Sequence, residues 1–165
     1  YTLSLHDALP IYALKLAKQS NVRTILNPAP AATLPDEMIA NADILTPNET
    51  ELEVLSRRTL DDIDAAARSL IRRDDQTVVV TLGAGGAQIV TSKNSINKPA
   101  IEVQPVDTTG AGDCFTGALA VALGEGKTLE EAVRFANTAA GICVTRPGTA
   151  TSMPSRQEVD VLIPE

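Results

Sequence analysis

The stretch DTTGAGDCFTGAL at residues 107–119 contains residues whose types and spacing could carry out chemistry. A single carboxylate, Asp113, follows Gly110, Ala111 and Gly112 and precedes an apolar run that predicts a helix. Uncovered backbone N–H groups in such a turn can converge on an anion, and the helix start adds a partial positive charge. A phosphoryl group in transfer is such an anion, and Asp113 could take the proton of an attacking hydroxyl.

A structural role for Asp113 is equally open on spacing alone. An Asp at a helix start often serves stability only, because its side chain caps backbone N–H groups that have no partner inside the helix. We expect Asp113 to cap the helix in either case. The choice between a cap and a catalytic base therefore needs further observations.

A second glycine turn, GAGG at residues 83–86, follows the apolar run TVVVTL at residues 77–82. Continuous β-branched residues are typical of a strand buried on both faces of a parallel sheet. Ligands collect at the carboxyl ends of parallel strands, so the turn is a candidate binding loop. The alternative is a simple tight turn.

Two other glycine motifs do not fit the nucleotide fingerprints that they resemble. The string GEGKT at residues 124–128 lacks the first glycine of a P-loop, because Val121 occupies that position. The string GAGDCF fails the dinucleotide pattern, since Phe115 stands where the third glycine belongs. We expect Thr128 to cap the following helix instead.

The elements that must position these motifs are strands alternating with helices. The predicted strands lie at residues 22–26, 42–45, 77–82, 87–92 and 100–106. The predicted helices lie at residues 12–20, 35–40, 46–56, 61–73, 112–124, 128–145 and 155–163. This alternation predicts an α/β fold with a largely parallel sheet.

Composition narrows the class of protein. The chain has 165 residues, enough for one domain with a core, and 44% of them are hydrophobic. A net charge of −7 argues against nucleic acid or an anionic membrane surface as the main partner, and no run predicts a membrane span. Cys114 and Cys143 lie among small apolar residues without metal-ligand spacing. They predict buried free thiols and a cytoplasmic location.

The first residues, YTLSLHDALPI at 1–11, do not resemble the start of a domain. They begin without Met and resemble translated sequencing-adapter DNA. They also contain the only histidine, His6, to which we assign no function. We predict a non-native leader at residues 1–11 and a domain that runs from Tyr12 through residue 165.

The order of the motifs resembles the ribokinase-like family of sugar kinases from about Tyr12 onward. The matching strings are NPAPA (27–31), TPNETE (46–51), VTLGAGG (80–86), DTTGAGD (107–113), FANTAA (135–140) and VTRPGTATSMP (144–154). The resemblance implies a three-layer α/β/α fold with a mostly parallel sheet. It covers only the carboxy-terminal part of the family's pattern, so we expect a fold truncated on the amino-terminal side.

The resemblance implies catalytic roles for the residues of the first motif. Asp113 matches the base that deprotonates the sugar hydroxyl attacking the γ-phosphorus of ATP. Gly110, Ala111 and Gly112 match the anion hole that neutralises charge on the phosphoryl oxygens.

The resemblance also implies a nucleotide and magnesium site. Asn48 and Glu51 match an element that organises Mg²⁺ and water around the phosphates, although they could simply form a capping box at a helix start. The positions that match the nucleotide site are Thr81, Gly83, Gly86, Gly112 and Asn137, together with Asn48. Asn137 would lie beside the adenine, although an Asn on a helix face could equally face solvent.

A monovalent cation, usually K⁺, is implied by a further set of matches. These residues are Asp107, Thr109, Cys143, Arg146, Gly148 and Ser152. Most would contribute backbone carbonyls, and Asp107 would supply the charge. The ion would fix the loop that carries the anion hole, so activity would depend on K⁺.

The implied function is an ATP-dependent sugar kinase that phosphorylates D-ribose at its 5-hydroxyl. Two alternatives stay open: a sibling kinase for fructose, a sugar phosphate or a nucleoside, and a nucleotide-binding module without catalysis. The family's amino-terminal half, with the sugar pocket and a β-lid, has no counterpart here. We therefore predict little or no activity for this chain alone. Because members often pair through their lids, a homodimer stays open for the full-length parent.

Overall fold

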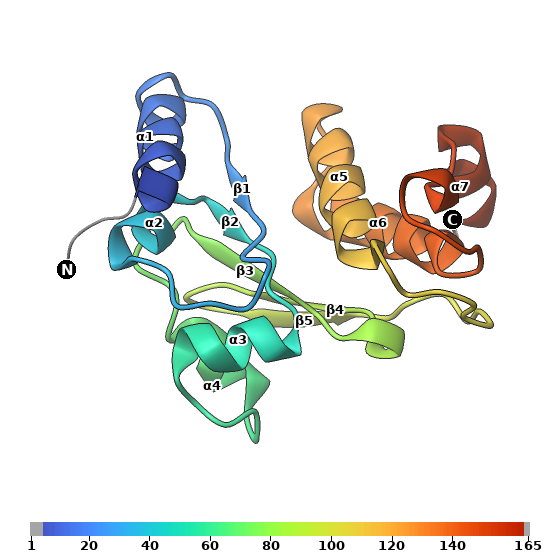
Figure 1. Cartoon of the computed structure of the whole chain (residues 1–165), viewed down its shortest axis with the longest axis horizontal. Helices are drawn as coiled ribbons and strands as arrows, with labels where there is room; N and C mark the ends of the chain where they lie inside the picture. Colours follow the sequence, from blue (N-terminus) through green and yellow to red (C-terminus); the bar gives the residue numbers. More distant parts are fainter. Residues whose placement is uncertain (1–4, 164–165) are drawn as a thin grey trace. The chain divides into compact units, whose positions relative to one another are not determined.

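The computed structural model describes the backbone of residues 5–163 and the side chains of residues 8–163 (Figure 1). Residues 1–4 of the predicted leader and the side chain of His6 lie outside these limits. The first helix, α1 (Leu5–Gln19), begins within the predicted leader rather than at Tyr12. The chain divides into two compact units. The first runs through Val80 and includes Ile89–Ile96, and the second comprises Thr81–Gln88 and continues from Asn97.

Three parallel strands begin the sheet. β1 (Ile25–Leu26) pairs with β2 (Ile44–Leu45), and β2 pairs with β3 (Thr77–Thr81). The register places Leu45 opposite Val78. Residues 78–80 are fully buried, as the continuous β-branched run predicts. The predicted parallel arrangement is therefore confirmed for these three strands.

Two further strands complete the order β1-β2-β3-β4-β5. β4 (Ala87–Val90) follows β3 through a turn that contains the short helix η1 (Gly83–Gly85), and β5 (Ser95–Lys98) lies at the edge. A connection as short as residues 82–86 can join neighbouring strands only in antiparallel orientation. The sheet is therefore mixed, with its parallel side at β1–β3.

The prediction of a strand at residues 100–106 is wrong. This segment has no regular structure, and β5 occupies the region predicted as a polar connector. The apolar side chain of Ile101 packs on a helix instead of a strand, since a Cβ on Gly141 would lie 2.5 Å from Ile101 Cγ1. Pro99 and Pro105 also lack the N–H groups that a β-ladder requires.

The first unit contains three more helices, α2 (Asp36–Asn41), α3 (Glu49–Ser56) and α4 (Ile63–Arg68). α4 begins after Asp62 as predicted, but it ends at Arg68 rather than Arg73. The buried Gln76 side chain accepts a hydrogen bond from Arg72 N at 2.7 Å and donates to Ile39 O at 2.6 Å. These bonds hold the backbone after Arg68 in a turn.

The second unit is built on α5 (Ala111–Gly124) and α6 (Leu129–Cys143), which pack against each other, and α7 (Arg156–Leu162) contacts α6 (Figure 1). A short helix, η2 (Ala150–Ser152), precedes α7. α6 begins with a capping box in which Thr128 N donates to Glu131 Oε2 at 2.8 Å, so the predicted cap is confirmed. Across residues 5–163, every helix is too short or too polar to cross a lipid bilayer.

Candidate functional site

Gly110 fixes the start of α5. Its φ of 79° lies in the left-handed region that favours glycine, and it is the N-cap of the helix. Ala111 N donates to Thr108 O at 3.2 Å. The N–H groups of Gly112 and Asp113 belong to the first helical turn and show no acceptor among the described residues. These two donors are suited to an external anion.

Asp113 does not cap α5, so that prediction is wrong. The N-cap is Gly110, which has no side chain, and the structure shows no side-chain cap hydrogen bond there. Asp113 is the third residue of the helix and is exposed, without a hydrogen bond or ion pair to the described residues. A carboxylate in this position is available to accept a proton beside the two amide donors.

Asp107 ties the loop before α5 to the turn after α6. Its Oδ1 accepts a hydrogen bond from Thr109 N at 2.9 Å, and its Oδ2 accepts one from Gly148 N at 3.0 Å. Hydrogen bonds from the Thr109 side chain and backbone, and from Gly148 N, lower the pKa of the Asp107 carboxyl to about 2. Asp107 therefore keeps its negative charge at neutral pH.

The remaining residues of the predicted cation set lie in the same unit. Cys143 Sγ is 3.2 Å from Ser152 Oγ, and Ser152 Oγ donates to Thr149 O at 2.6 Å. Arg146 donates its backbone N–H to Cys143 O at 3.2 Å, and its side chain pairs with Glu158. These contacts link Cys143 to Ser152 and to the backbone of Arg146.

Both thiols are buried, as predicted, and neither forms a disulfide. Burial, together with the neighbouring Cys143 thiol, raises the pKa of Cys114 to about 12. Among the described residues no cluster of three or more His, Cys, Asp and Glu side chains is arranged to hold a metal ion.

The second glycine turn is closed by its own backbone. Leu82 N donates to Gly86 O at 2.8 Å, and Gly86 N donates to Gly83 O at 3.0 Å. Gly86 has a φ of 87°, and a Cβ there would lie 2.1 Å from Lys98 O. Only glycine fits this close approach. Thr81, the last residue of β3, is half-buried directly before the turn.

Asn137 lies beside the segment that Gly86 touches. Its Nδ2 donates to Lys98 O at 2.8 Å and to Pro99 O at 3.1 Å, and the residue is only 6% exposed. The alternative that Asn137 faces solvent is therefore wrong. The structure brings Gly86 and Asn137 together through the backbone of residues 98–99.

Asn48 and Glu51 belong to the first unit and form a capping box at the start of α3. Asn48 Oδ1 accepts from Glu51 N at 2.8 Å, and Glu51 Oε2 accepts from Asn48 N at 2.9 Å. The alternative structural role is therefore confirmed. Glu51 is only 6% exposed, and among the described residues the hydrogen bond to its carboxylate is made at Oε2. Its second oxygen is of the hard type that Mg²⁺ prefers, so a metal role can coexist with the cap.

Three residues of the second unit were not identified from the sequence. Val144 O accepts hydrogen bonds from Val106 N at 2.7 Å and Asp107 N at 3.1 Å. Thr149 packs on the helix start, since a Cβ on Gly110 would lie 3.5 Å from Thr149 Cβ. Glu158 pairs with Arg146. The S-x-x-E spacing at residues 155–158 could have predicted the α7 capping box, but it carries no signal for the ion pair.

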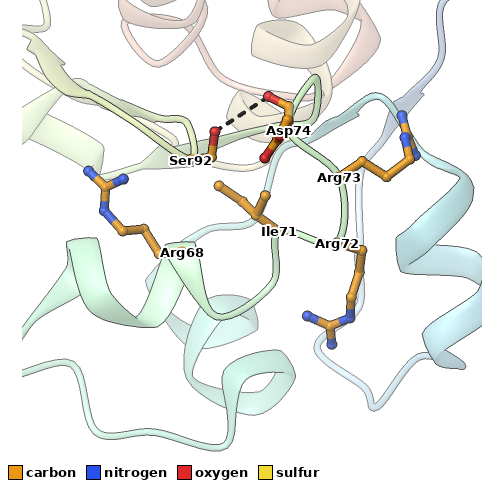
Figure 2. A pocket seen from close by; sticks show the side chains of 6 residues that line it. All are labelled: Arg68, Ile71, Arg72, Arg73, Asp74 and Ser92. Atoms are coloured by element: carbon orange, nitrogen blue, oxygen red, sulfur yellow. Dashed lines mark hydrogen bonds between the residues drawn. The ribbon is translucent and has the colours of Figure 1, made fainter.

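An open pocket of about 560 Å³ lies in the first unit (Figure 2). It is lined by Arg68, Ile71, Arg72, Arg73, Asp74 and Ser92. None of the predicted site residues lines it. Its three guanidinium groups form ion pairs with Asp64, Asp36 and Asp43. The pocket therefore presents paired charges and is a weak candidate for an anion site.

Comparison with known proteins gives a consistent result. The model for the family described as pfkB family carbohydrate kinase matches residues 7–156. A ribokinase from Haemophilus influenzae is 42% identical over 149 residues, which cover 88% of this chain and 49% of that protein.

Two solved structures extend the comparison to the fold. The structure of Arabidopsis thaliana ribokinase complexed with ribose and ATP matches with a TM-score of 0.88 at 39% identity, covering 95% of this chain and 52% of that chain. Phosphofructokinase-2 from Escherichia coli in complex with potassium matches with a TM-score of 0.78 at 28% identity, covering 93% and 50%. These likenesses confirm the α/β fold predicted from the sequence. The chain spans about half the length of the curated relatives that it matches.

Proposed function

Because the chain belongs to the pfkB family of carbohydrate kinases, we propose that it is the carboxy-terminal part of an ATP-dependent ribokinase. The full-length enzyme transfers the γ-phosphoryl group of ATP to the 5-hydroxyl of D-ribose. Ribose is favoured because relatives at about 40% identity are named ribokinase, and one solved relative holds ribose and ATP. Since the chain spans about half of these proteins, the activity is assigned to the full-length parent.

The start of α5 is the observation that carries this proposal. Gly110 places the N–H groups of Gly112 and Asp113 at a helix start without acceptors, and the exposed carboxylate of Asp113 lies in the same turn. Amide donors in this arrangement stabilise the negative charge that spreads over the phosphoryl oxygens during transfer. A stability cap would have occupied the carboxylate with hydrogen bonds, and the structure shows none.

Asp113 acts as the general base in the proposed reaction. Its carboxylate accepts the proton of the sugar hydroxyl as that oxygen forms a bond to the γ-phosphorus. The bond between the γ-phosphorus and the bridging oxygen breaks, and ADP leaves with the electron pair. Gly110 and Ala111 shape the turn. The backbone N–H groups of Gly112 and Asp113 stabilise the negative charge on the phosphoryl oxygens by donating hydrogen bonds to them. Positioning and charge stabilisation account for most of the rate.

The nucleotide is held by the glycine turn of residues 83–86 with Thr81, and by Gly112 and Asn137. Asn137 acts at least partly by holding the backbone of residues 98–99, to which it donates two hydrogen bonds. Asn48 and Glu51 would hold Mg²⁺ together with water ligands, and the ion would neutralise charge on the nucleotide phosphates. The second carboxylate oxygen of Glu51 supports this assignment.

K⁺ is proposed as an activator at the turn after α6. The residues proposed to surround it are Asp107, Thr109, Cys143, Arg146, Gly148 and Ser152. The low pKa of Asp107 and its hydrogen bond to Gly148 support a charged, organised loop there. A solved relative is described in complex with potassium, which favours this type of cation.

We also keep a cytoplasmic location and a homodimer of the full-length parent as proposals. Two buried, unpaired thiols suit a reducing compartment. The net charge of −7 is unfavourable for binding to nucleic acid or to an anionic membrane surface.

The test uses the full-length parent and measures ADP release with ribose, 2-deoxyribose and fructose. We expect ribose to be the preferred substrate, and Asp113→Asn to lower turnover by roughly 10²–10⁴-fold while ATP binding persists. Glu102→Gln is the matched control, because Glu102 is another exposed carboxylate of the same unit and lies outside the proposed site. It should leave turnover unchanged.

Near-normal turnover of Asp113→Asn would remove Asp113 from the mechanism. Tight ATP binding without phosphoryl transfer to any sugar would overturn the kinase proposal in favour of a nucleotide-binding module. We also expect the 165-residue chain alone to show little activity, and vigorous ribose-dependent ADP release by it would contradict that expectation.

A further inference from the structure

Glu158 on α7 uses its two carboxylate oxygens for different partners. Oε2 accepts hydrogen bonds from Ser155 N at 2.8 Å and from Ser155 Oγ at 2.9 Å, which completes the capping box of α7. Oε1 pairs with the guanidinium group of Arg146. The hydrogen bonds from Arg146 and Ser155 lower the pKa of Glu158 to about 2, so the side chain is charged at neutral pH. The capping box needs only the hydrogen bonds at Oε2, so the ion pair of Oε1 with Arg146 is an additional interaction.

Arg146 belongs to the turn that follows α6. This turn contacts the beginning of the Asp107–Gly110 loop, which leads into α5 and its amide donors. Val144 O accepts hydrogen bonds from Val106 N and Asp107 N, at 2.7 and 3.1 Å. Gly148 N donates to Asp107 Oδ2 at 3.0 Å. Arg146 lies between these two attachment points in the sequence.

The same turn also reaches the end of the loop. A Cβ on Gly110 would lie 3.5 Å from Thr149 Cβ, which is ordinary van der Waals contact distance. Gly148 has a φ of 95°, and a Cβ there would lie 2.7 Å from Thr151 Oγ1. The backbone at this position of the turn therefore favours glycine. Residues 144–149 contact the loop at Asp107 and at Gly110, the two ends of the segment that leads into α5.

We propose that Glu158 is a positioning residue for phosphoryl transfer, because it holds the 144–149 turn through Arg146 and thereby fixes the amide donors at the start of α5. The inference rests on the proposed kinase function, and it assigns to α7 a role beyond covering α6. Glu158 touches no reacting atom in this scheme. It acts on the geometry of the Asp107–Gly110 loop.

A second ion pair on α7 provides an internal contrast. Asp160 accepts hydrogen bonds from Arg156 Nε at 2.8 Å, and Arg156 also pairs with Glu125 at the end of α5 and lies 5.1 Å from the Phe135 ring centroid. This network does not include the 144–149 turn. The side chains of both ion pairs are between about a third and half exposed, so neither pair is expected to contribute much to stability.

The experiment compares three single variants of the full-length enzyme and the double variant that combines the changes at Glu158 and Arg146. Glu158→Gln keeps an acceptor for the capping box, in which Gln is accepted, but loses the second carboxylate oxygen that binds Arg146. Arg146→Gln removes the same pair from the other side. Asp160→Asn is the matched control, because it weakens a carboxylate–arginine pair on the same helix. The measured quantities are kcat, KM for ribose, the K⁺ concentration for half-maximal rate, and backbone amide hydrogen exchange.

We expect Glu158→Gln and Arg146→Gln each to lower kcat by roughly tenfold, within the range that a misplacement of about 1 Å can cost, with KM for ribose unchanged. The double variant should be no slower than the single variants, since both remove one interaction. Amide exchange at Gly148 should accelerate in Glu158→Gln and stay unchanged in Asp160→Asn. A merely structural role would instead give similar, small effects in both α7 variants.

The outcomes separate this inference from the proposed function. If the unmodified enzyme phosphorylates ribose but Glu158→Gln matches Asp160→Asn in kcat and in Gly148 exchange, the positioning role is overturned and the kinase function stands. If the unmodified enzyme phosphorylates no sugar, the kinase proposal fails. Accelerated Gly148 exchange in Glu158→Gln alone would then still support the coupling between α7 and the turn.

Discussion

Gly148 donates its backbone N–H to Asp107 Oδ2 at 3.0 Å, across a sequence separation of 41 residues. The other oxygen, Oδ1, accepts the N–H of Thr109 at 2.9 Å. One carboxylate therefore joins the turn after α6 to the loop before α5. This arrangement explains how residues far apart in the sequence can act on the same group of backbone donors.

The first prediction concerns the cation dependence of this connection. We expect the full-length enzyme to be faster in potassium than in sodium buffers, and Asp107→Asn to lose roughly tenfold in rate and most of that difference. Asn has an NH2 donor in place of one carboxylate oxygen, so that position cannot accept the backbone N–H that faces it, and the side chain carries no charge. The rates are measured at fixed ionic strength, with Asp160→Asn as control. Equal rates of the unmodified enzyme in both salts would contradict the proposed K⁺ site.

The second prediction tests the packing of residues 100–106 on α6. Gly141→Ala places a Cβ 2.5 Å from Ile101 Cγ1, so we expect it to lower the free energy of unfolding by about 1–3 kcal/mol. Gly117→Ala is the control, because a Cβ at this position of α5 meets nothing within 4 Å. It should be neutral or stabilising by up to about 1 kcal/mol.

Urea unfolding of the single variants and of Gly141→Ala with Ile101→Ala checks this packing. Ile101→Ala removes both the Cγ1 and the Cδ1 atoms that lie nearest the added methyl group. The double variant should therefore lose less stability than the sum of the two single changes. Strict additivity would show that Gly141 and Ile101 do not contact each other in solution.

The sequence predicted the central elements well because their signals are local. The continuous β-branched run at residues 77–82 predicts a strand buried on both faces, and Thr128 predicts the cap of the helix that follows it. The motif at residues 107–113 likewise predicted a glycine turn before a helix, and Gly110 with α5 confirms it. Within this motif, the prediction that Asp113 caps the helix is wrong. Gly110, in the left-handed conformation, is the N-cap and offers no side chain. The sequence alone does not distinguish a helix that starts in this way from one that is capped by an Asp side chain.

The irregular conformation of residues 100–106 and the environment of Asn137 could not be predicted because their determinants are not local. Ile101 packs where Gly141 leaves room on α6, and Asn137 donates to the backbone of residues 98–99. Both contacts join residues about forty positions apart. An apolar run gives the same pattern whether a strand or a helix covers it.

The third prediction addresses these buried hydrogen bonds. Asn137→Ala removes the donor to Lys98 O and Pro99 O, so we expect a loss of about 1–3 kcal/mol of stability and an increased KM for ATP. Thr138→Val is the matched control, because Thr138 is also buried but bonds only within α6, to Arg134 O. It should leave KM for ATP unchanged. An unchanged KM in Asn137→Ala would separate residues 98–99 from the nucleotide site.

The fourth prediction concerns pH and the start of α6. Hydrogen bonds from the Thr128 side chain and backbone lower the pKa of Glu131 below its ordinary value of 4.5. A carboxyl with a lowered folded-state pKa contributes stability that is fully present above the unfolded value and is lost as the pH falls through the folded value. We therefore expect urea unfolding of Glu131→Gln to depend less on pH below about 4.5 than that of the unmodified protein, because Gln keeps the capping geometry without titrating. Identical pH dependence of the two proteins would show that Glu131 titrates normally and that the capping box contributes no proton linkage.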